Sequence, residues 1–161
     1  MKMLLKATAA VAALAVVFGV GWLASGIGIG RVADVDSLSD RERAFTERMR
    51  NVVLVGHFTI AGREQGDRLP ERYEIESVTK LDGDRWRFMA RVVYMNVDVT
   101  LPVVVPVAWA GDTPMVSLTD VSLPGLGEGF SARVLFYDER YAGTWDHGEY
   151  GGLMFGAIEP M

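Results

Sequence analysis

The stretch of residues 85–109, RWRFMARVVYMNVDVTLPVVVPVAW, constrains the fold more than any other part of the chain. Apolar side chains alternate along its first half, where Trp86, Phe88 and Tyr94 share one face. A period of two that is rich in aromatic and β-branched residues is typical of half-buried β-strands. We therefore predict two long antiparallel strands joined by a turn near residues 95–96.

The second of these strands carries two prolines on one face, Pro102 and Pro106. Because they are four residues apart, their missing N–H groups face the same neighbouring strand. Proline cannot donate to a β-ladder, so it is confined to edges and bulges. The spacing predicts an edge or a weak seam on this side of the strand.

The chain after residue 51 continues in the same pattern, and we predict an all-β domain over residues 52–161. Eight strands are expected, at 52–60, 72–81, 85–95, 97–109, 115–121, 130–137, 140–147 and 152–158. Short links between them favour an eight-stranded antiparallel meander barrel, lipocalin-like and open at one seam, with a two-sheet sandwich as the alternative. Large aromatic side chains on the faces assigned inward predict a largely filled core with a shallow pocket at one end.

The N-terminal residues 1–30 are expected to form a membrane anchor or a signal segment. Residues 7–30 carry no charge, and Lys2 and Lys6 precede them. About 20 apolar residues span a bilayer, so this run predicts an uncleaved transmembrane helix, and a cleaved signal peptide is the alternative. The lysines favour a cytoplasmic N-terminus. The β-domain would then lie on the periplasmic side of the inner membrane, or be secreted after cleavage.

Residues 31–51 are predicted to form a linker with a short amphipathic helix at 37–50. Ser39 and Glu42 have the spacing of a capping box, and Leu38, Phe45 and Met49 form a narrow apolar stripe. We expect this helix to pack on one end or side of the β-domain. A partner-binding helix is the alternative.

Composition excludes several classes of function. The chain has no cysteine, which excludes disulfides, thiolate zinc sites and thiol catalysis. All 21 acidic residues follow residue 30, together with 14 of the 16 basic ones, so this part of the chain has a net charge of −7. A nucleic-acid surface needs a basic field, so we expect no nucleic-acid partner.

The most distinctive motif is the stretch YAGTWDHGEYGG at residues 141–152. It resembles the Gly-x-Trp signatures of lipocalin-like and avidin-like barrels, in which the signature lies on the first strand and the tryptophan closes one end. Here Gly143 and Trp145 lie near the C-terminus. It is also similar to uncharacterised bacterial envelope proteins. The resemblance to the barrels implies a small-ligand-binding barrel without a cofactor.

The candidate ligand-binding residues are polar or amphipathic side chains expected near the pocket mouth, together with two tryptophans. They are Tyr73, Ser77, Trp86, Tyr141, Trp145 and His147. We assign no catalytic residue, metal ligand or cofactor. The sequence leaves enzymatic activity open and favours a non-enzyme, because a hydrolase acting through His57 or His147 lacks a recognisable nucleophile elbow.

Three functions follow from these patterns, in order. The first is a cell-envelope barrel that binds a small apolar ligand. The second is an envelope protein–protein interaction module that uses the exposed strand edge, with an unknown partner. The third is a hydrolase.

Overall fold

The computed structural model describes residues 31–62, 68–94, 97–123 and 127–161. The described chain begins with a 3₁₀ turn η1 (Val35–Ser37) and a helix α2 (Asp40–Arg48), and β-strands follow. The strands are β1 (Val52–Phe58), β2 (Leu69–Lys80), β3 (Arg85–Tyr94), β4 (Val97–Ala110), β5 (Thr113–Leu123), β6 (Gly127–Tyr137), β7 (Arg140–His147) and β8 (Tyr150–Pro160).

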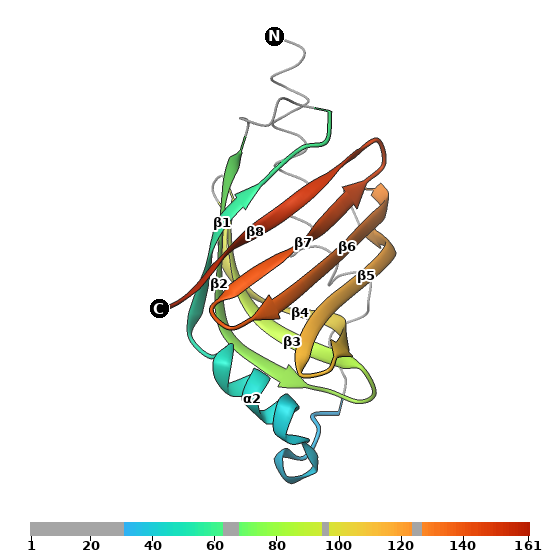
Figure 1. Cartoon of the computed structure of the whole chain (residues 1–161). Helices are drawn as coiled ribbons and strands as arrows, with labels where there is room; N and C mark the ends of the chain where they lie inside the picture. The colour runs from blue at the N-terminus through green and yellow to red at the C-terminus, as the bar shows by residue number, and fades with distance from the viewer. Residues whose placement is uncertain (1–30, 63–67, 95–96, 124–126) are drawn as a thin grey trace.

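The eight strands form a closed antiparallel barrel in which each strand pairs with its neighbours in sequence and β1 pairs with β8 (Figure 1). This confirms the meander barrel and excludes the sandwich. Alternation explains why these segments become strands: on β3, Trp86, Phe88 and Ala90 are buried inside the barrel, and the residues between them are not. On the outer face, Arg91 pairs with Glu74 of β2 at 2.7 Å.

The barrel is closed, so the prediction of a barrel open at one seam is wrong, but the ladder between β4 and β5, on the side of the prolines, is short. Within the described residues, β4 pairs with β3 along Val97–Pro106 but with β5 only along Val107–Ala110. The N–H of Val107 donates to the carbonyl of Asp84 on the β3 side at 2.8 Å. Because N–H groups alternate sides along a strand, positions 102 and 106 face β5, where no ladder needs their N–H.

One sequence prediction about β2 is wrong. Alternation from Tyr73 would place Ser77 on the inner face, as its assignment to the pocket mouth requires, but the register shifts between Ile75 and Ser77. After this bulge, Val78 pairs with the buried Phe88, and Ser77 pairs with Met89 on the outer face. The extra residue turns Ser77 away from the interior, so it cannot line an internal pocket.

The helix α2 closes one end of the barrel, as Figure 1 shows. Phe45 is 2% exposed, and its ring centre lies 5.4 Å from that of Trp86 and 5.9 Å from those of Trp109 and Phe136. Met49, one helical turn later, is fully buried. The predicted stripe is therefore confirmed at Phe45 and Met49, which close the barrel end, whereas Leu38 lies before the helix and is only partly buried.

A partly buried ion pair fixes the helix to β2. The ammonium of Lys80 lies 2.5 Å from the Glu42 carboxylate, which also accepts hydrogen bonds from the backbone and hydroxyl of Ser39. Burial alone would raise the pKa of Glu42, but these donors outweigh it and lower the pKa below its usual value. Glu42 thus caps the helix and anchors it.

The predicted N-terminal anchor at residues 1–30 lies outside the described residues. None of the helices in the described part of the chain has the length and apolar character needed to cross a bilayer.

Candidate functional site

A buried glutamate, Glu71, lies inside the barrel and is only 8% exposed. It belongs to a row of inward positions that crosses four strands. In this row Glu71 of β2 faces Gly56 of β1, Gly56 faces Gly156 of β8, and Gly156 faces Tyr141 of β7. The Tyr141 hydroxyl donates to the Glu71 carboxylate at 2.7 Å. The row therefore places an acid and a phenol in contact across two intervening strands.

The two glycines are what allow this contact. A Cβ atom on Gly56 would lie 2.5 Å from the Tyr141 hydroxyl oxygen, and one on Gly156 would lie 2.7 Å from Cε1 of the same ring. Any larger residue at either position would occupy the space that the Tyr141 side chain fills. Glycine at both positions therefore lets the Tyr141 side chain lie close to the backbone of β1 and β8.

A second phenol completes the cluster. The hydroxyl of Tyr73, two residues along β2, donates to the other carboxylate oxygen of Glu71 at 3.2 Å. Tyr141 is fully buried, whereas Tyr73 keeps part of its surface exposed. The cluster of Glu71, Tyr73 and Tyr141, hereafter the polar trio, thus reaches the edge of the apolar interior on the Tyr73 side.

Burial dominates the electrostatics of the polar trio. It raises the pKa of Glu71 above its usual value, and the two tyrosine donors offset this only in part. Burial likewise raises the pKa values of Tyr73 and Tyr141, and the neighbouring carboxylate adds to the effect. None of the ion pairs between described residues involves Glu71. The Glu71 carboxyl group therefore accepts hydrogen bonds from two neutral tyrosine hydroxyls.

The interior beside the polar trio is closely packed. A cavity of about 20 Å³ lies at the centre of the described core, bounded by Tyr141 and by apolar side chains such as Leu54, Phe88 and Met154. This is about the space of one water molecule. In the described part of the barrel, the prediction of a largely filled core is confirmed.

The structure brings together two of the six candidate residues, Tyr73 and Tyr141. Trp86 is fully buried near the helix α2, and Ser77 lies on the outer face. Trp145 is buried near the opposite end, where its ring packs on Phe58 and its Nε1 donates to the carbonyl of Thr59 at 3.2 Å. The candidates therefore do not form one site.

The two histidines do not form a catalytic pair. His57 is exposed on the outer face of β1, against the ring of Phe155. His147 lies at the end of β7 on the same side of the strand as Trp145, and burial lowers its pKa. Among the described residues, no group of three or more His, Asp or Glu side chains could hold a metal ion.

Sequence analysis missed Glu71, although a signal was present. Glu71 precedes Tyr73 and Ile75 at intervals of two, so the alternation already placed it on the inner face. It was overlooked because an acidic residue near a predicted loop suggests solvent.

We expect the polar trio to make stability depend on pH. Because burial raises the folded-state pKa of Glu71, the folded protein holds this proton to a higher pH than the unfolded chain does. Stability should therefore fall as pH rises from the ordinary glutamate pKa through the raised one. In Glu71→Gln this contribution disappears, so the stability of the variant relative to the parent should increase as the pH rises through the range above about pH 4. Urea denaturation across that range measures it, and a difference that does not change with pH would contradict it.

Searches of protein families, of curated proteins and of solved structures found no match for this chain.

Proposed function

We propose that this protein is a small-ligand-binding barrel of the cell envelope, and that its ligand binds against the polar trio. The supporting observation is the convergence of Glu71, Tyr73 and Tyr141 in a barrel whose other buried side chains, among those described, are apolar. Sites for small molecules typically combine apolar walls with a few convergent polar groups. The helix α2 closes one barrel end, so the ligand would enter elsewhere.

The chemistry of the trio limits the ligand. A carboxylate accepts hydrogen bonds, so the ligand head should be a donor such as a hydroxyl or an amine. The cavity of about 20 Å³ admits only a small group next to Tyr141. The larger apolar part would therefore lie towards Tyr73, which is partly exposed.

Ligand titrations of the full-length protein test this proposal. The probes are farnesol and dodecylamine, with tryptophan fluorescence and melting temperature as readouts. We expect at least one probe to change both signals through binding linkage. Glu71→Gln should weaken that probe about tenfold, the loss expected for one hydrogen bond to a charged group.

The matched control is Arg87→Gln, which removes a charge from the outer side of β3 and should leave affinity unchanged. If no probe responds, or if both variants bind as the parent does, the proposal that a ligand binds against the polar trio is wrong.

The proposed location is the inner membrane, with the barrel on the periplasmic side. It rests on the uncharged run at residues 7–30 behind Lys2 and Lys6. N-terminal sequencing of protein isolated from membranes should give the intact start. A mature start near Ile27 would leave secretion as the alternative.

A second candidate function uses the edge of β4 to pair with a strand of another envelope protein. It is favoured by the ten residues of β4 that pair only with β3 among those described. The prolines weaken it, because proline at an edge opposes strand addition.

Thr100→Pro with Val104→Pro would block the edge further without affecting the β3 ladder. Loss of a native complex in this variant, observed by light scattering after gel filtration, would favour the interaction module. A parent that is monomeric alone and in membrane extracts would exclude it.

A further inference from the structure

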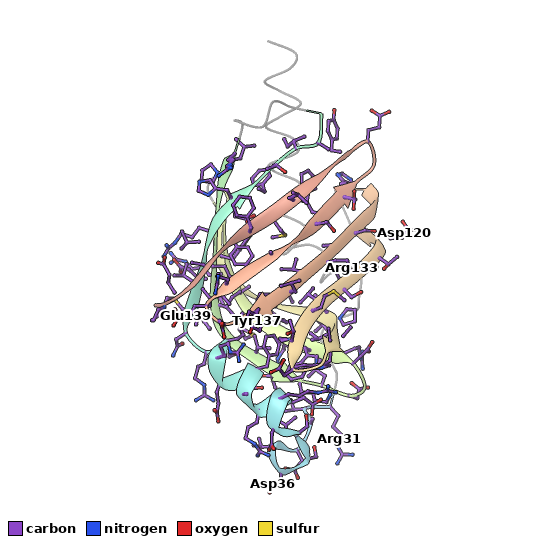
Figure 2. The ribbon with its side chains drawn as sticks, in the orientation of Figure 1. Arg31, Asp36, Asp120, Arg133, Tyr137 and Glu139 are labelled. Carbon is purple, nitrogen blue, oxygen red and sulfur yellow. The ribbon has the colours of Figure 1, made fainter. Side chains whose placement is uncertain are left out.

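The outer wall of the barrel has a groove of about 540 Å³ over β6, β7 and β8. Its lining comes mainly from two adjacent rows of outward positions, with Tyr141 and Gly156 between them. In one row Leu135 faces Ala142, and Ala142 faces Phe155. In the other, Tyr137 faces Arg140, and Arg140 faces Ala157. Figure 2 shows Tyr137 beside the hairpin that carries Glu139, near the α2 end of the barrel.

The shape of the groove follows from side-chain size. The bottom of the groove is formed by the small side chains of Ala142 and Ala157. Its sides are formed by larger residues, Leu135, Tyr137 and Phe155. Leu135 is 41% exposed and Tyr137 is 55% exposed, which leaves much apolar surface in water. A contiguous exposed apolar surface in a hollow is typical of a binding site. Covering it with a hydrocarbon chain removes this surface from water, which is favourable.

The cationic groups near the groove are two arginines, of which one lines it. Arg140 lines it, and the guanidinium of Arg68 lies 5.6 Å from the ring centre of Phe155 at its other side. Among the ion pairs between described residues, none involves Arg140 or Arg68. The acids of the hairpin, Asp138 and Glu139, line an adjoining hollow together with Arg140, but neither forms an ion pair with it. The groove thus combines apolar walls with the guanidinium of Arg140, which has no ion-pair partner among the described residues.

We propose that this groove binds a single-chain anionic amphiphile, a long-chain carboxylate. Its hydrocarbon chain lies over Ala142 and Ala157, and its carboxylate bonds to Arg140, because a guanidinium matches a carboxylate with two parallel hydrogen bonds. A membrane surface fits less well. The lining of the groove comes from three neighbouring strands only, β6, β7 and β8, which gives room for one hydrocarbon chain rather than for a bilayer surface. The site is on the opposite side of the wall from the polar trio.

Photolabelling of the full-length protein with a diazirine-bearing hexadecanoate tests this proposal, with labelled residues identified by mass spectrometry. We expect labels on outward residues such as Phe155 and Tyr137, and competition by laurate but not by dodecyltrimethylammonium. Ala142→Leu with Ala157→Leu fills the groove and should reduce labelling at least fivefold. Ala108→Leu, at an exposed position of β4, is the matched control and should label as the parent does.

Two further variants test which head group the ligand carries and which of the two sites it occupies. Arg140→Gln should reduce labelling by the carboxylate about fivefold but not labelling by the diazirine-bearing alcohol of the same length. Glu71→Gln should leave labelling unchanged, which separates this site from the interior one. The proposal is overturned if the groove-filling variant labels like the parent, or if the cationic amphiphile competes equally. Stronger labelling by an anionic diacyl phospholipid in vesicles would also overturn it, in favour of a membrane contact.

Discussion

Replacing Phe45 with alanine is expected to destabilise the protein by about 3–5 kcal/mol, the usual cost of removing a buried aromatic ring. The ring is 2% exposed and lies within 6.2 Å, centre to centre, of the rings of Trp86, Phe88, Trp109 and Phe136. Alanine would leave a cavity at the barrel end that these four side chains cannot fill by small shifts. Urea denaturation followed by tryptophan fluorescence measures the loss.

The control for this change is Glu47→Ala, on the exposed side of the same helix, which should alter stability by less than about 0.5 kcal/mol. The fluorescence of Trp86 and Trp109 reports directly on whether the helix α2 closes the barrel end, because both rings contact Phe45. Their emission should shift to the red in Phe45→Ala under native conditions, because opening the end admits water. A variant that keeps the parent's stability and emission would show that the helix does not close the barrel.

The elements that the sequence predicted correctly are those in which one periodic pattern determines the structure. The alternation of Trp86 and Phe88 can be satisfied only by a strand with one buried face. In the same way, the spacing of Phe45 and Met49 fits only a helix with one buried stripe. The short ladder on the side of Pro102 and Pro106 was predictable for a related reason, since a missing N–H has a fixed direction on a strand.

The errors occurred where the pattern permits two outcomes. After Ile75, polar residues such as Ser77 and Thr79 fit either face of a strand, so nothing in the sequence marks the bulge. Glu71 had the right spacing for the interior, but its type suggested the surface. A buried acid becomes plausible only when its donors are known, and Tyr141 is 70 residues away in sequence.

The two candidate sites depend on register, which alternation along one strand does not determine. The contact of Glu71 with Tyr141 requires that β1 and β8 pair with Gly56 opposite Gly156. The outer groove likewise requires the alignment of Leu135, Ala142 and Phe155 across three strands. Shifting a strand by one residue would exchange its inward and outward side chains and remove both sites.

Substitution of Gly56 by alanine tests that register directly, and we expect it to destabilise the protein by about 3 kcal/mol, at the upper end of the usual cost of overpacking. The new Cβ would overlap the carbonyl oxygen of Phe155 and would lie 2.5 Å from the Tyr141 hydroxyl oxygen and 2.7 Å from the Gly156 Cα. The clash with backbone atoms cannot be relieved by a change of rotamer. Denaturant unfolding measures the stability of the variant.

The control is Gly62→Ala. Its Cβ would meet no atom within 4 Å, but its φ of +82° is unfavourable for alanine, so a loss of about 1 kcal/mol is expected. Gly56 has no positive φ, so its loss reports crowding alone, and a larger loss at Gly56 than at Gly62 would show that crowding costs more than backbone strain. Gly56→Ala should also push Tyr141 away from Glu71, so removing the tyrosine hydroxyl in the same protein should cost less than Tyr141→Phe does in the parent. Equal costs in the two backgrounds would mean that Tyr141 does not cross Gly56 to reach Glu71.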